Sequence, residues 1–64
     1  MNHFKENLKE LRLIYKYSQR RIATILGISQ VQYFKYESGI NEPNIDMLIR
    51  ISNLFDISLD ELIL

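Results

Sequence analysis

The sequence predicts an all-α fold. Apolar residues recur at helical spacing along nearly the whole chain. No stretch shows the alternating pattern of a strand, and no internal repeat or low-complexity segment interrupts the pattern. The chain has 64 residues, the size of one small domain. We therefore expect a single domain, residues 1–64, built from five short helices.

An apolar stripe predicts the first helix. Phe4, Leu8, Leu11 and Tyr15 follow one another at intervals that place them on one face of an amphipathic helix. We expect this face to pack against the rest of the domain.

A serine precedes the second helix. Ser18 is a good N-cap residue, and Ile22, Ala23 and Leu26 follow it at helical spacing. Gly27 then breaks the pattern, so the second helix should end there.

The third helix also begins after a serine. Ser29 and Gln32 have the spacing of a capping box. The helix should end at Ser38 and Gly39, because glycine suits the left-handed position after a helix.

Two more helices complete the chain. The segment 40–43 reads as a loop closed by a proline. The stripe of the fourth helix comprises Ile45, Leu48, Ile49, Ser52 and Phe55. Ser58 and Glu61 then form a second capping box, which opens a short last helix.

The second and third helices are joined by about three residues centred on Gly27. Two helices that cross steeply at a glycine-containing turn form a helix-turn-helix. Ala23 supplies the small residue at the crossing, and Gly27 tolerates a positive φ. The facing apolar residues are Ile22, Leu26, Ile28, Tyr33 and Tyr36. The sequence thus predicts this motif at about residues 19–38.

Charge is unevenly distributed along a chain whose net charge is zero. Residues 1–38 carry seven Lys and Arg against three Glu, which gives +4. Residues 39–64 carry one Arg against five Asp and Glu, which gives −4. This asymmetry fits one face that meets an anionic partner, and it also fits an ordinary solvated surface.

Several function classes are excluded by composition. The chain has no cysteine and one histidine, His3, so we expect no disulfide, no metal site and no Ser–His catalytic pair. No phosphate-binding glycine loop is present either, and we expect no cofactor and no enzymatic activity. No apolar run approaches about 18 residues and no leader is evident. We therefore expect a cytoplasmic protein with no membrane partner.

Four segments together resemble a known family. They are LKELR at Leu8–Arg12, SQRRIATILGIS at Ser18–Ser29, YFKYESG at Tyr33–Gly39, and the tail EPNIDMLIRISNLFDISLDEL. In this order and spacing they resemble the phage repressor and Cro-type helix-turn-helix family, often called XRE-type. The resemblance covers roughly Leu8 to Leu62.

The resemblance implies a compact five-helix lambda-repressor-like domain that binds double-stranded DNA. Its members regulate transcription, usually as homodimers, and no small-molecule effector is evident here. Three features depart from the family, the first of which is the zero net charge of the chain. Lys16 stands where the family often has glycine, so that turn should be modestly strained. The loop Ile40-Asn41-Glu42 lacks the basic residues that are common there.

The third helix should have two unlike faces. At 100° per residue, Tyr33 and Tyr36 share one face, which we expect to lie in the core. The opposite face should enter the major groove. There Gln30 can bond to adenine, Val31 can touch a thymine methyl, and Lys35 can reach guanine or a phosphate. The base-contacting positions of the family map onto these three residues.

Phe34 lies on the groove-facing side, where an exposed ring is costly. Three interpretations remain open. The ring contacts thymine methyls or sugars, folds back on Ile40, or forms part of a protein contact.

Arg12 and Glu37 should form an ion pair, since the family commonly joins these two positions. Gln19 opens the second helix, where free backbone N–H groups favour an anion, and in the family this glutamine grips a phosphate. The expected phosphate contacts are Gln19, Lys16, Ser38, Asn41 and Asn44. Such contacts position a protein on DNA without reading sequence.

The chain is apolar to its last residue. Leu59, Leu62, Ile63 and Leu64 are therefore candidate dimer contacts, although Leu59 and Leu62 could equally cover the core of their own chain. The predicted function is that of a sequence-specific regulator, most simply a repressor that binds a palindromic operator as a homodimer. The alternative is a protein-interaction module, such as an antitoxin-like or anti-repressor partner, with weak DNA binding.

Overall fold

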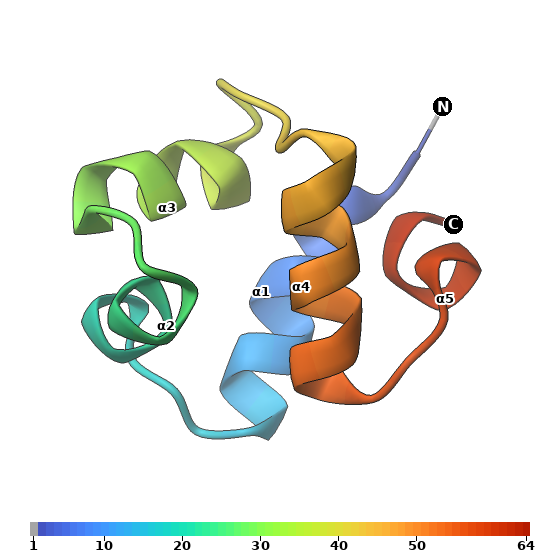
Figure 1. Ribbon diagram of the computed structural model, residues 1–64, viewed down its shortest axis with the longest axis horizontal. Coiled ribbons are helices and arrows are strands. Elements are labelled where there is room, and N and C mark those ends of the chain that lie inside the picture. Colours follow the sequence, from blue (N-terminus) through green and yellow to red (C-terminus); the bar gives the residue numbers. More distant parts are fainter. Residues whose placement is uncertain (1) are drawn as a thin grey trace.

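The structure, a computed structural model, describes residues 2–64 as five helices (Figure 1). They are α1 (Phe4–Ile14), α2 (Gln19–Leu26), α3 (Gln30–Ser38), α4 (Ile45–Phe55) and α5 (Leu59–Ile63). No strand occurs between residues 2 and 64, and the predicted all-α fold is confirmed.

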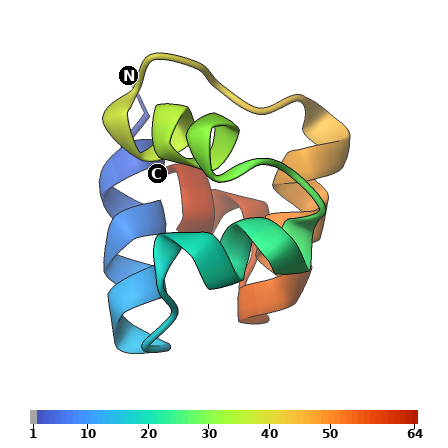
Figure 2. The same ribbon diagram turned by 90° about the vertical axis from the view of Figure 1, so that its left-hand side faces the viewer.

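The helices surround one apolar core. In Figure 1, α2 and α3 lie on one side of α4 and α5 lies on the other. Figure 2 shows α3 above α2, with α1 and α4 flanking the pair. Each helix contributes buried side chains: Phe4, Leu8, Ile22, Ala23, Leu26, Tyr33, Tyr36, Ile51, Phe55 and Leu62. Within this core α3 packs against α1 and α2.

Serine side chains begin three helices as expected. Ser18, Ser29 and Ser58 each accept a hydrogen bond from the backbone N–H three residues later. The box at Ser58 is complete, because Glu61 also accepts from the Ser58 N–H. The box expected at Ser29 is only half formed. The Gln32 amide donates instead to the Tyr36 hydroxyl, 3.1 Å away, which gives a buried tyrosine its polar partner.

The stripe expected on α4 is partly wrong. Ile45 and Ile49 are 70% and 41% exposed, whereas Ile51 is fully buried. The face that meets the core runs through residues 48, 51, 52 and 55, and α4 packs against α5. Ile45 and Ile49 lie beside this face and not within it.

Tyr15 also departs from its expected place in a buried stripe. It follows the last residue of α1 and is 46% exposed. Its ring packs edge-on against Phe55 at 5.0 Å between centroids, and its hydroxyl donates to the Phe55 carbonyl. The residue thus pins the end of α1 to the end of α4.

The turns before, within and after the helix-turn-helix use left-handed backbone. Gly27 and Gly39 end α2 and α3 with φ of 73° and 79°. Lys16 also has a positive φ, 60°, at the position where the related family often has glycine. A side chain in this region costs about 1–2 kcal/mol, which agrees with the expected strain.

None of the helices in residues 2–64 is long and apolar enough to cross a membrane.

Candidate nucleic-acid interface

The two faces of α3 differ in burial as the sequence predicts. Tyr33 and Tyr36 are 0% and 5% exposed. On the opposite side Val31 is 65% exposed and Gln30 is also exposed. Lys35 is only partly exposed, since it sits nearer the edge of this face. A readable polar and apolar surface therefore runs along the outside of α3.

Phe34 keeps half of its surface exposed. With Gln19, Gln30 and Val31 it lines a shallow pocket of about 290 Å³ between the start of α2 and the outside of α3. The interpretation in which Phe34 folds back on Ile40 gains no support, because Ile40 is 64% exposed. The ring belongs to the outward surface.

A buried ion pair holds the C-terminal half of α3. Arg12 Nε lies 2.5 Å from Glu37 Oε2, and Arg12 Nη2 donates to Glu37 Oε1 at 3.2 Å. The side chains are only 11% and 5% exposed. The remaining Arg12 nitrogen donates to the Tyr17 carbonyl at 3.0 Å. The pair implied by the family resemblance thus joins α1, α3 and the segment before α2.

Two further residues complete this network. The Tyr33 hydroxyl donates to Glu37 Oε2, and Gln19 Nε2 donates to Glu37 Oε1 at 3.2 Å. Neither contact is among those predicted from the sequence. The i, i+4 spacing of Tyr33 and Glu37 could have indicated the first. The second depends on how α2 meets α3, which no local pattern shows.

The network shifts the ionisation of its members. Burial raises the pKa of Glu37, but hydrogen bonds from Arg12, Tyr33 and Gln19 outweigh it, so the pKa lies below its ordinary value. The hydrogen bond to Glu37 raises the pKa of Arg12. Burial, reinforced by Glu37, raises the pKa of Tyr33 well above its ordinary range. Glu37 is thus a carboxylate, and Tyr33 a neutral donor, at neutral pH.

The expected phosphate contacts lie at three places around α3. Lys16 is exposed before α2, and Gln19 is half-buried at its first turn. Ser38 and Asn41 are exposed at the end of α3. Asn44 caps α4, since its Oδ1 accepts from the Met47 N–H at 2.9 Å. Its amide nitrogen is the part left for a phosphate.

The four candidate dimer residues separate into two groups. Leu62 is fully buried in the core, so the expectation that it contacts a second copy is wrong. Ile63 packs partly against the same core. Leu59 and Leu64 are 38% and 73% exposed and, with the partly exposed Ile63, remain candidates.

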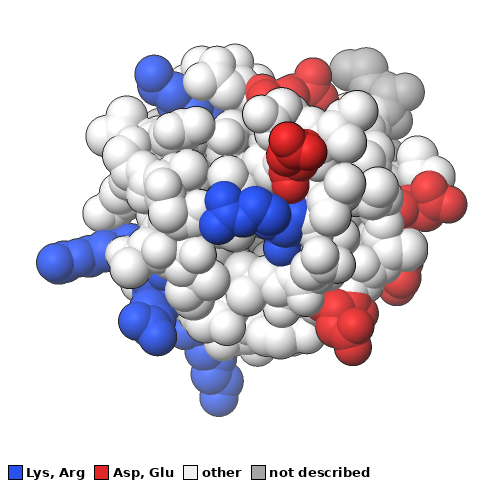
Figure 3. Space-filling model, in the orientation of Figure 1, with Lys and Arg blue, Asp and Glu red and all other residues white. Residues whose placement is uncertain are grey.

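Charge is unevenly distributed on the face that Figure 3 shows. Most Lys and Arg on this face lie on the side of α2 and α3, most Asp and Glu lie towards α4 and α5, and both signs meet over α4. Within residues 2–64 no group of acidic or histidine side chains is placed to hold a metal ion. The positive side is the one that carries the outward face of α3.

Two helices joined at a left-handed glycine, the second with an outward face of mixed polar and apolar groups, define a helix-turn-helix domain. The chain belongs to the helix-turn-helix family HTH_3, whose model matches residues 8–62. These residues include all of α2 and α3.

Similar proteins are transcriptional regulators by name. The uncharacterised HTH-type transcriptional regulator YqaE of Bacillus subtilis is 47% identical over 94% of this chain and 52% of its own length. The cryptic phage CTXphi transcriptional repressor RstR of Vibrio cholerae is 40% identical over 91% of this chain and 52% of its own. The chain spans about half the length of these relatives.

A solved structure agrees in fold. The crystal structure of a transcriptional regulator from Listeria innocua superposes with a TM-score of 0.94 at 33% identity, over 98% of this chain and 59% of that one. The helix-turn-helix family that the sequence was found to resemble is confirmed as the family of this chain. The family is one of DNA-binding proteins and not of enzymes, in agreement with the expectation from composition.

Proposed function

We propose that the chain is the DNA-binding part of a transcriptional regulator and reads double-stranded DNA with the outward face of α3. One observation carries this proposal. The inner face of α3 is fixed by buried rings and by the Glu37 network. Among residues 2–64, Gln30 and Lys35 make no side-chain hydrogen bond within the protein. A helix held firmly on one side and free on the other suits groove reading.

The chemistry of the outward face matches that of the major groove. The Gln30 amide can pair with adenine N6 and N7, and Lys35 can donate to guanine O6 and N7 or to a phosphate. Val31 and Phe34 offer apolar surface, and the thymine methyl is the apolar group that the major groove presents. We propose Gln30, Val31, Phe34 and Lys35 as the base contacts.

Phosphate contacts would fix the register of α3 on the duplex. We propose Lys16 and Gln19 at the start of α2, Ser38 and Asn41 after α3, and the Asn44 amide nitrogen for this role. In the structure the Gln19 amide nitrogen already donates to Glu37. A phosphate bound by Gln19 would therefore be coupled to the network that positions α3.

Repression through a palindromic operator is the specific form that we propose. A relative at 40% identity is named as a phage repressor. One recognition helix reads few base pairs, so specificity favours two copies on half-sites about 34 Å apart. Leu59, Ile63 and Leu64 are the proposed dimer contacts. Because such a regulator acts on the chromosome or on phage DNA, we also propose a cytoplasmic location.

A second candidate function is a protein-interaction module. Leu11, Ile14 and Ile57 line a groove of about 190 Å³ between α1 and the start of α5, bordered by Glu10 and Glu61. Ile14 is 64% exposed. This groove lies away from α3, so a protein bound there could control the regulator or replace DNA as its main partner.

Selection from a random double-stranded DNA library with the purified protein tests the proposal. We expect an enriched palindrome with half-sites about one helical turn apart. A matched selection with a Gln30→Ala, Lys35→Ala double variant should lose the preference while the protein stays folded. No enrichment by a folded wild-type protein would contradict sequence-specific binding and favour the interaction module.

A further inference from the structure

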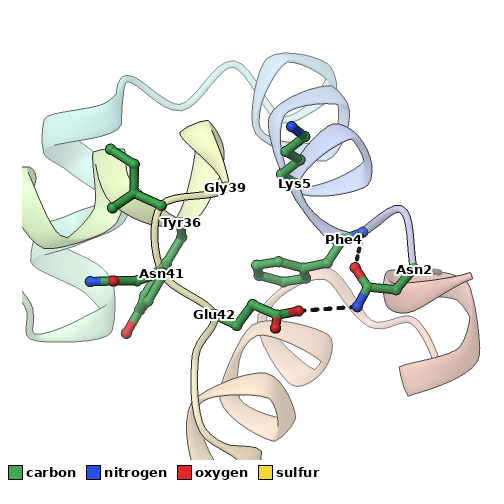
Figure 4. A pocket seen from close by; sticks show the side chains of 8 residues that line it. Asn2, Phe4, Lys5, Tyr36, Gly39, Asn41 and Glu42 are labelled. Carbon is green, nitrogen blue, oxygen red and sulfur yellow. Dashed lines mark hydrogen bonds between the residues drawn. The ribbon is translucent and has the colours of Figure 1, made fainter.

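Lys5 of α1 lies against the C-terminal end of α3. A β-carbon placed on Gly39 would be 2.9 Å from Lys5 Cδ and 3.3 Å from Lys5 Nζ. The side chain therefore crosses from α1 to α3 and fills the space that any larger residue at position 39 would need. Figure 4 shows Lys5 and Gly39 at the same end of a pocket of about 500 Å³.

The charge of Lys5 has no acidic partner among residues 2–64, where the one ion pair joins Arg12 and Glu37. Glu42 lines the same pocket, but its Oε2 accepts from the Asn2 amide at 3.1 Å (Figure 4). A lysine near a helix C-terminus is favoured by the helix dipole, which explains its position. In this position the Lys5 ammonium group keeps its three N–H groups available to an anion.

Lys5 is the first residue of a basic stripe along α1. Lys5, Lys9 and Arg12 share one face of α1, since they are spaced by four and three residues. Arg12 on this stripe contacts Glu37 of α3 directly. Lys16 follows in the turn that leads to α2. The stripe therefore runs along α1 past the C-terminal end of α3 and on to the start of α2 (Figure 2).

The loop after α3 needs a cation from elsewhere if it is to meet DNA. Residues 40–44 contain no Lys or Arg and one acidic residue, Glu42. The groups exposed at this end of α3, Ser38 and Asn41, are neutral. A phosphate that approached them would find Lys5 as the cation beside Gly39.

We propose that Lys5, from outside the helix-turn-helix, binds a DNA phosphate at the C-terminal end of α3, beside a loop that has no Lys or Arg of its own. Ser38 or Asn41 would donate to the same phosphate. This inference rests on the proposed function, because it requires that α3 lies on DNA. It adds a contact that carries affinity and no sequence information.

The test is the salt dependence of binding to a short duplex of mixed sequence, so no operator is required. Each phosphate contact that is lost should reduce the slope of log K against log salt by about 0.9. We expect that reduction, per protomer, in Lys5→Gln. Arg50→Gln is the matched control, because it removes the same charge at a different place. Arg50 lies beside Gly27, in the turn before α3. The slope of Arg50→Gln should equal that of the wild type.

A second comparison separates contact from fold. On a duplex taken from the library selection, where the register is fixed, replacing one phosphate at a time with an uncharged methylphosphonate should identify a position that weakens the wild type more than it weakens Lys5→Gln. If Lys5→Gln and Arg50→Gln both keep the wild-type slope, the role of Lys5 is overturned and the proposed function is not. A wild type that binds no duplex at low salt would overturn the proposed function as well.

Discussion

The inner and outer faces of α3 differ in burial and in their contacts with the rest of the protein. Inside, Tyr33, Tyr36 and Glu37 are tied to α1 and α2 by ring burial and by a charged network. Outside, Gln30 and Val31 are exposed, and the Gln30 side chain makes no hydrogen bond to the rest of residues 2–64. The inner face should therefore set stability, and the outer face should set DNA binding. Substitutions on the two faces can break or sharpen this division.

The largest effect on stability is expected inside. Arg12→Ala would leave the Glu37 carboxylate buried without its cation, at a cost of about 3 kcal/mol in the free energy of unfolding. Urea denaturation measures this cost. Arg21→Ala, on the exposed surface of α2, is the control and should change stability by less than about 0.5 kcal/mol. A loss below about 1 kcal/mol in Arg12→Ala would show that the pair does not anchor α3.

Acid should weaken the same network. The pKa of folded Glu37 lies below its ordinary value of 4.5, so the ionised pair contributes its stability above that value. The contribution is lost as the pH falls through the lower folded pKa. Glu37→Gln cannot show this loss, so its difference from the wild type should shrink in acid. A difference that stays constant with pH would contradict the role of the carboxylate.

On the outer face the effect should move from stability to binding. Gln30→Ala and Lys35→Ala should each cost about 1–3 kcal/mol of discrimination at one base pair, since a bidentate contact is lost. Their free energy of unfolding should stay within about 0.5 kcal/mol of the wild type. Affinities for a selected duplex and its single-base variants provide the measurement. An equal loss of affinity for every base would indicate that the residue contacts a phosphate and not a base.

Lys16→Gly should change stability and binding in opposite directions. Glycine removes the strain of a side chain at φ 60°, and after its own entropy cost the protein should gain about 0.5–1 kcal/mol. DNA affinity should fall if Lys16 contacts a phosphate. Thermal unfolding and titration with one duplex measure the two quantities. A stabilised variant with undiminished affinity would remove Lys16 from the interface.

The smallest effect tests the apolar part of the outer face. Replacing a contacted thymine with uracil removes one methyl group and should cost about 0.8 kcal/mol of binding. The cost should disappear in a Val31→Ala, Phe34→Ala variant, which lacks the apolar surface of the pocket. If the wild type tolerates every such replacement, Phe34 belongs to a protein contact instead.

The two faces of α3 could be predicted from sequence because ring spacing is a local property of one helix. The same holds for the helix starts at Ser18 and Ser58, where side chain and backbone are neighbours in the chain. Tertiary packing decided the rest. Ile49 and Leu62 are chemically alike, yet one is exposed and the other buried.

The candidate site divides in the same way. Gln30 and Val31 could be placed on the outer face from helical periodicity alone. The bond from Gln19 to Glu37 and the approach of Lys5 to Gly39 join residues that are 18 and 34 positions apart. No spacing rule connects them, because both depend on how whole helices meet.

Mapping of the DNA-contacting surface by amide chemical shifts tests the central claim most directly. The 15N-labelled protein would be titrated with a duplex taken from the library selection. We predict the largest shifts at Gln30, Val31, Phe34 and Lys35 and in the first turn of α2. Shifts centred on Leu11, Ile14 and Ile57, with α3 unmoved, would contradict the claim that the outer face of α3 reads DNA.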